Sequence, residues 1–291
     1  MPKTVVDQLR ANLAQFTATE RRVAHQLLAD WPMAGLQSAT DLARTTGVST
    51  PTVLRLAARL GYASYPGFQK RLREELAAQL SSPLAKSAQS TVTATRRAGA
   101  RGGGAFAEAV IRNLRETFAN LPPTELEEAG RLLADRRRRV HLVGGRFTDA
   151  LAHYLSVQLR VLRPGVGHLH DQESNWQDQL LDMGKRDVLV VFDIRRYQPS
   201  LLRLAEAAAA RGARVVLLTD QWLSPVARVA AHLLAARVMV PSVLDSSAAL
   251  LALGEALLAE VTRRDWAGSK RRMRDLERLR DQQRPPSTPS K

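Results

Sequence analysis

Arginine, hydroxyl and glycine residues follow three apolar runs of this sequence and could together bind a small anion. The runs, Val140–Val143, Val188–Val191 and Val215–Leu218, are short and rich in β-branched residues, as buried strands are. Guanidinium groups bind carboxylates and phosphates through paired hydrogen bonds, and glycine lets a backbone approach a ligand closely. The residues expected to contact such a ligand are Gly144, Gly145, Arg146, Thr148, Asp193, Arg195, Arg196, Thr219 and Ser246.

The arginines of this group also have a structural interpretation. They could cross a dimer interface, or they could pair with the nearby acids Asp149, Asp171, Asp193 and Asp220. The adjacent pair Arg195 and Arg196 favours the ligand, because arginines directly after a buried strand would lie at the mouth of a pocket. Such a mouth suits a carboxylate or a phosphate.

A second group of residues could contact DNA. Thr46-Gly47-Val48 predicts a tight turn between two helices, and Ser49 can cap the second helix, Thr50–Leu60. Its apolar residues recur at helical spacing, which leaves hydroxyl and arginine side chains on the other faces. Such side chains can approach base edges and phosphates in a major groove, although a plain helical hairpin with solvated arginines is the alternative. The candidates for DNA contact are Ser49, Thr50, Thr52, Arg55 and Arg59.

Capping signals and composition divide the chain that must position these residues. Thr17 and Glu20 have the spacing of a capping box, and Ser38 precedes the next helix. After residue 105, apolar strands alternate with amphipathic segments, which predicts a parallel sheet with helices on both faces. We predict an all-helical helix-turn-helix domain at residues 1–80 and a flexible linker at 81–105. An α/β domain at 106–265 and a basic, disordered tail at 266–291 follow.

Composition narrows the class of protein further. The chain has 291 residues, 45% of them apolar, which fits about two globular domains. It contains no cysteine, which excludes disulfides, zinc sites ligated by cysteine and thiol catalysis. We expect a cytoplasmic protein, because no signal peptide or apolar membrane span is recognisable. The net charge of +15 suits a polyanionic partner, although arginine-rich composition alone could produce it.

Histidine and carboxylate residues allow two further interpretations. His168 and His170 share one strand face near His153, but the sequence places no further metal ligand, so no metal ion or other cofactor is expected. A sugar-phosphate isomerase would need a general base beside its substrate. The candidate bases Glu173, Glu255 and His170 have no distinctive spacing, so we expect no catalytic residue and no enzyme.

The first 77 residues resemble the helix-turn-helix domain of the MurR/RpiR family of bacterial transcription regulators. The resemblance lies in Phe16–Ala24, Thr40–Ala43, Gly47–Arg55, Arg59–Tyr62 and Phe68–Lys70, in that order. It implies binding to double-stranded operator DNA, adds Lys70 to the DNA candidates, and implies a C-terminal SIS (sugar isomerase) domain that senses a metabolite.

Residues 120–263 resemble such a SIS domain in strand order, and this implies a three-layer α/β/α fold with about five parallel strands. SIS domains that bind phosphosugars usually show Gly-x-Gly-x-Ser in the first loop, where this chain has Gly144, Arg146 and Thr148. They also show Ser-x-Ser-Gly-x-Thr later, where this chain reads Asp193–Gln198. Arginine thus replaces the hydroxyls, and we expect the ligand to be a sugar phosphate or a sugar acid.

The expected function is control of transcription by such a ligand, with an isomerase on the same fold as the alternative. A bare dimerisation module without a ligand is a third possibility. A two-fold dimer would double the DNA contacts of a small helix-turn-helix unit. The apolar segment Ser246–Val261 offers more apolar face than one sheet can cover. We therefore expect a homodimer or a homotetramer that forms through the C-terminal domain, without contact to a membrane.

Overall fold

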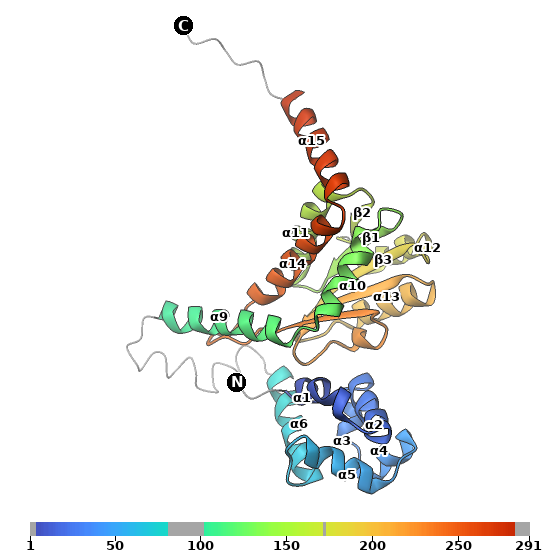
Figure 1. The fold of residues 1–291 in the computed structure, drawn as a ribbon, viewed down its shortest axis with the longest axis vertical. Helices are drawn as coiled ribbons and strands as arrows, with labels where there is room; N and C mark the ends of the chain where they lie inside the picture. Colours follow the sequence, from blue (N-terminus) through green and yellow to red (C-terminus); the bar gives the residue numbers. More distant parts are fainter. Residues whose placement is uncertain (1–3, 81–101, 171–172, 283–291) are drawn as a thin grey trace.

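The computed structural model describes residues 4–80, 102–170 and 173–282, in a helical N-terminal part and an α/β C-terminal part (Figure 1). The predicted linker 81–105 lies mostly outside these residues, as do Asp171 and the last nine residues of the tail. Among the described residues, no helix is both long and apolar enough to cross a bilayer.

Within residues 4–80, the structure has six α-helices and a short 3-10 turn, Leu13–Gln15. The α-helices are α1 Val5–Asn12, α2 Ala18–Ala29, α3 Met33–Leu36, α4 Ala39–Thr46, α5 Thr50–Arg59 and α6 Tyr65–Leu80. Reciprocal capping boxes start α1 and α2, the latter at the predicted Thr17 and Glu20. Gly47 ends α4 in the left-handed region at φ 61°, which glycine adopts without steric cost.

One apolar cluster holds these helices together. It contains Leu9 of α1, Leu27 of α2, Leu42 of α4, Leu56 of α5 and Phe68 of α6, all almost fully buried. Each helix thus contributes an apolar face to a shared core, which is what stabilises short helices in a protein.

A five-stranded parallel sheet forms the centre of the C-terminal part, in the order β2-β1-β3-β4-β5. The strands are β1 Arg139–Gly144, β2 Val166–His168, β3 Asp187–Asp193, β4 Arg214–Asp220 and β5 His232–Ala236. The β-branched runs correctly predicted β1, β3 and β4. They did not mark β2, which has three residues, or β5, in which no residue is β-branched.

Helices cover both faces of the sheet, which confirms the predicted three layers. On one face, α10 (Pro123–Ala134), α11 (Asp149–Leu162) and α14 (Ala248–Arg264) pack on the strands. On the other face, α12 (Trp176–Leu181), α13 (Pro199–Ala210) and the 3-10 turn Pro225–Arg228 complete the core. The 3-10 turn Glu173–Asn175 precedes α12.

Two helices extend beyond the predicted domain limits. Helix α9 spans Gly102–Asn120 and so begins inside the predicted linker. Helix α15, Trp266–Gln282, replaces most of the tail that we predicted to be disordered. Polar anchors hold α15: Ser269 Oγ donates to Leu162 O at 3.2 Å, and Arg272 Nε donates to Arg160 O at 2.7 Å. The prediction was wrong because apolar periodicity does not reveal anchors of this kind.

Candidate DNA-binding and ligand sites

Helices α4 and α5 and the turn at Gly47 form the predicted helix-turn-helix. Val53, Leu56 and Ala57 bury one face of α5, while Leu54 and Arg55 are exposed on the other. Arg22 of α2 fixes the turn, because its guanidinium donates to the carbonyls of Thr46 and Gly47. Sequence reasoning missed Arg22, whose partners lie 24 and 25 residues away.

The predicted DNA residues do not all have the same role in the structure. Ser49, Arg55 and Lys70 are exposed, and Thr50 is half-buried. Thr52 is buried, with its hydroxyl 3.0 Å from Ser49 Oγ and 3.3 Å from Arg55 Nη2. Thr52 therefore positions the two exposed side chains and is too buried to reach a base edge in this conformation.

Arg59 is held by α2, although we expected it to contact DNA. Its Nη1 lies 2.6 Å from Oε2 of Glu20, the residue that also closes the capping box of α2. Burial raises the pKa of Glu20, but hydrogen bonds from Thr17 and Arg59 outweigh it and leave that pKa below its ordinary value. The ion pair joins α5 to α2 through Nη1 of Arg59, whose side chain is still 47% exposed.

The turn between β1 and α11 is tightly built. The Gly145 amide donates to Thr148 Oγ1 at 2.9 Å, and that hydroxyl donates to Phe192 O at 2.7 Å. The Arg146 amide donates to Gln198 Oε1 at 2.6 Å, which joins this turn to the one after β3. Thr148 is therefore a structural residue, while the Arg146 side chain is exposed.

Replacing Gly144 by Ala should destabilise the C-terminal part by about 1–3 kcal/mol. A Cβ atom there would lie 2.5 Å from Asp149 Cα and from Thr148 C, and both are backbone atoms that cannot move aside. Gly104→Ala is the matched control, since no atom lies within 4 Å of its added Cβ. Urea unfolding of both variants measures the effect, and equal stabilities would contradict it.

Arg195 is engaged by other residues of the chain. Its backbone has φ 61°, its amide donates to Asp220 Oδ2 at 2.6 Å, and its guanidinium lies 4.2 Å from the Trp222 ring centroid. Two guanidinium nitrogens contact Asp245, one of them at 2.8 Å. The Arg195 guanidinium thus pairs with Asp245, which is not among the four acids we considered, while its amide contacts Asp220, which is one of them. Arg196, by contrast, is exposed.

Three other predicted ligand residues contact the protein itself. Thr219 is buried and donates to Asp193 O at 2.7 Å, and Asp193 accepts a hydrogen bond from Ser224. Ser246 Oγ accepts from the Ala248 amide at 3.3 Å, at the start of α14. The side chains of the predicted group that remain open to solvent are those of Arg146 and Arg196. We call Gly145, Arg146, Arg196 and Gln198 the strand-end site.

Replacing Asp193 by Asn should stabilise the protein more at pH 8 than at pH 5. Burial, and the nearby Asp220, raise the pKa of Asp193 from 3.8 to about 7. The folded state therefore favours the protonated acid. The contribution of Asp193 to the free energy of unfolding is fully present below pH 4 and is lost as the pH rises through 7. Because Asn stays neutral, its advantage should be about 2 kcal/mol greater at pH 8. Urea unfolding at both pH values tests this, and an equal difference at both would contradict it.

The histidine and carboxylate candidates do not converge on one centre. His168 Nε2 lies 2.8 Å from Asp149 Oδ1, and His168 Nδ1 lies 3.3 Å from His153 Nδ1. No group of three potential ligands that could hold a metal ion occurs within the described ranges. Glu173 accepts from Gln198 Nε2 at 3.1 Å and Glu255 from the Tyr154 hydroxyl at 2.9 Å, so both candidate bases are engaged.

Arg237, directly after β5, connects the two parts of the chain. Its guanidinium pairs with Asp7 of α1 and lies 3.7 Å from Glu116 Oε2 of α9. Its amide donates to Thr117 Oγ1 at 2.9 Å. The sequence carried no signal for this contact, since Asp7 and Arg237 are 230 positions apart. The segment from Arg237 to Ser247 thus links α1 to Asp245, the partner of Arg195.

Comparison with known proteins identifies both parts. The model for the helix-turn-helix domain of the rpiR family matches residues 3–79, and the SIS domain model matches residues 132–260. None of the curated proteins matches the chain.

The solved structures that are similar to this chain include two bacterial proteins. One is the sugar isomerase domain of an RpiR transcription factor from Sphaerobacter thermophilus, which is 28% identical, with a TM-score of 0.56. The match covers 60% of this chain and 96% of that protein chain. The other is the Vibrio vulnificus NanR protein complexed with ManNAc-6P, which is 18% identical, with a TM-score of 0.54. The match covers 94% of this chain and 97% of that protein chain. Residues 3–79 are thus a helix-turn-helix domain of the rpiR family, and a SIS domain follows it at residues 132–260.

Proposed function

We propose that this regulator binds operator DNA through α5. A small anionic metabolite at the strand-end site would change its affinity for that DNA. The observation that carries the DNA contact is the exposed pair Ser49 and Arg55, which the buried Thr52 holds at the start of a recognition helix. Lys70, exposed on α6, would add a phosphate contact. The net charge of +15 supports a polyanionic partner in the cytoplasm.

Arg146 and Arg196 would bind the anion of the metabolite. Both are exposed, and Gln198 holds the Arg146 turn beside the turn that carries Arg196. Arginine forks suit a sugar phosphate or a sugar acid, and the similar NanR protein was solved with ManNAc-6P. An enzymatic role has less support, because Glu173 and Glu255 are bound to neighbouring side chains.

The ligand would act on DNA binding through the segment Arg237–Ser247. An anion near Arg196 competes with Asp245 for the adjacent Arg195, and movement of Asp245 would shift that segment. Its other end contacts Asp7 of the DNA-binding part. A ligand changes an equilibrium only when its contacts differ between the two states, and exchange of Asp245 for the ligand supplies such a difference.

We propose that the protein works as a homodimer or a homotetramer. Helix α9 exposes Ile111 and Phe118 by 40% and 42%, and because these residues are seven positions apart they form an apolar face of the kind that dimers cover. A second copy would also supply the second half-site contact to a palindromic operator. Sedimentation should give a dimer or a tetramer, and a monomer at all concentrations would refute this proposal.

Two variants test the regulatory proposal. With ManNAc-6P, glucose 6-phosphate and gluconate as probes, at least one should raise the melting temperature and alter the operator affinity of the parent protein. Arg146→Ala/Arg196→Ala should abolish both effects. Arg237→Gln keeps the Thr4–Asp7 capping box, so it should retain the thermal shift but lose the effect on DNA. No response in the parent, or an equal response in both variants, would contradict the proposal.

A further inference from the structure

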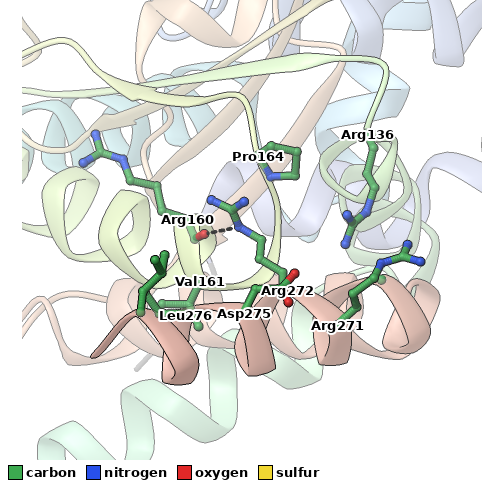
Figure 2. Close-up of a pocket in the computed structure, with 10 residues that line it drawn as sticks. Arg136, Arg160, Val161, Pro164, Arg271, Arg272, Asp275 and Leu276 are labelled. Carbon is green, nitrogen blue, oxygen red and sulfur yellow. Dashed lines mark hydrogen bonds between the residues drawn. The ribbon is translucent and has the colours of Figure 1, made fainter. Parts of the chain in front are cut away.

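A pocket of about 370 Å³ lies between α11 and α15, at the end of the sheet opposite to the strand-end site. Four arginines line it: Arg136 before β1, Arg160 on α11, and Arg271 and Arg272 on α15 (Figure 2). Small-molecule sites in proteins begin at volumes of about 300 Å³, so the pocket is large enough for a ligand. Figure 1 shows α15 far from the DNA-binding helices, so this site is separate from the proposed DNA contact.

The acids around this pocket offset only part of its positive charge. Arg136 pairs with Asp265. Asp275 itself lines the pocket, and its carboxylate lies 3.4 Å from Arg278, which is outside the pocket. Within the described part of the chain, no carboxylate forms an ion pair with Arg160, Arg271 or Arg272. Figure 2 shows Arg136 and Arg271 on one side of the pocket. The positive charges of both arginines lower the pKa of Asp265.

The buried arginine that precedes Pro164 adds to the positive charge near the pocket. Arg163 is only 1% exposed, and its guanidinium donates to the carbonyls of Leu133, Arg138 and Pro164. Burial lowers its pKa to about 10, which still leaves it cationic at neutral pH. A buried cation whose partners are carbonyl groups raises the potential at the pocket wall, where Pro164 lies.

The rest of the pocket surface is apolar. Val161 and Pro164 line it from the α11 side, and Leu276 and Leu279 line it from α15. Leu279 is 56% exposed. A ligand that fits both halves of this lining has an anionic group and an apolar body, and a hydrophilic sugar derivative does not meet this requirement.

We propose that this pocket is a second ligand site, for a small organic acid with an apolar body. Arg271 and Arg272 bind its carboxylate by charge-assisted hydrogen bonds, with Arg136 beside them. The apolar body covers Val161, Leu276 and Leu279. Arg136 forms an ion pair with Asp265 and packs against Gly268 of α15. The contact is close, because a Cβ atom added at Gly268 would lie 2.6 Å from Cζ of Arg136. The site is therefore preformed.

Titration calorimetry with decanoate tests this site on the full chain. The parent should bind decanoate at least tenfold more tightly than Arg271→Gln/Arg272→Gln, and at least tenfold more tightly than it binds acetate or decanol. Arg274→Gln/Arg280→Gln removes the same charge from exposed positions of α15 outside the pocket, and it should bind like the parent. The neutral alcohol separates the contribution of the anion from that of the apolar body.

Three results would overturn the proposal. Equal decanoate affinity in the parent and in Arg271→Gln/Arg272→Gln would show that these arginines do not bind the acid. An equal loss in the control variant would reduce the effect to general electrostatic attraction. A change in sedimentation of the pocket variant, without loss of decanoate binding, would assign this face to contact with a second copy.

Discussion

Arg55→Ala should weaken operator binding by about 2–6 kcal/mol in a dimer, because each recognition helix loses a contact that costs about 1–3 kcal/mol. Arg55 is exposed on α5, and its Nη2 lies 3.3 Å from the buried hydroxyl of Thr52, which orients it. Fluorescence anisotropy with a labelled operator measures the change, and a salt titration should show a smaller slope if Arg55 binds phosphate.

Two variants control this result. Arg203→Ala removes an exposed arginine of α13 in the SIS domain and should leave DNA affinity unchanged. Arg59→Ala should mainly lower stability, because Arg59 pairs with the buried Glu20. If Arg55→Ala binds like the parent at every salt concentration, α5 is not the recognition helix.

Arg195→Ala should destabilise the SIS domain by about 3–5 kcal/mol, which is the usual cost of breaking a buried ion pair. The side chains of Arg195 and Asp245 are only 11% and 12% exposed, and the variant leaves the Asp245 carboxylate without its bidentate partner. The stacking of the guanidinium on Trp222 is lost as well. Urea unfolding of the variant measures this change.

Arg196→Ala is the matched control for Arg195, since it removes an exposed arginine one position away. It should leave the stability within about 0.5 kcal/mol of the parent value. The two neighbouring arginines thus contribute differently to stability, because Arg195 forms a buried ion pair and Arg196 is exposed. Similar stabilities for both variants would contradict this division.

The helix-turn-helix could be predicted from the sequence because its signals are local. The capping box Thr17–Glu20, the glycine at position 47 and the apolar stripe of α5 all act within a few residues, and the structure contains each of them. The strands β1, β3 and β4 were predictable for a similar reason, since a run of β-branched residues marks each one.

The roles of individual arginines depended on distant partners. Arg59 and Glu20 are 39 residues apart, and Arg195 and Asp245 are 50 apart. An arginine that binds a ligand and one that binds a carboxylate of its own chain look alike in a sequence. Only the tertiary structure separates Arg195 from Arg196.

Helix α15 illustrates a third limit. Its sequence is strongly charged, and its contacts with α11 run through the Ser269 hydroxyl and the Arg272 guanidinium. Polar side chains that donate to backbone carbonyls leave no periodic trace. The pocket between these helices was hidden for the same reason.

Selection of DNA from a random pool by the full chain tests the central claim most directly. A dimeric regulator that reads DNA through α5 should enrich an inverted repeat, with half-site centres one helical turn of about 10 base pairs apart or a multiple of it. The same selection with Arg55→Ala should lose or relax the enriched bases. Absence of any enriched sequence, or the same enriched sequence with Arg55→Ala, would contradict the account.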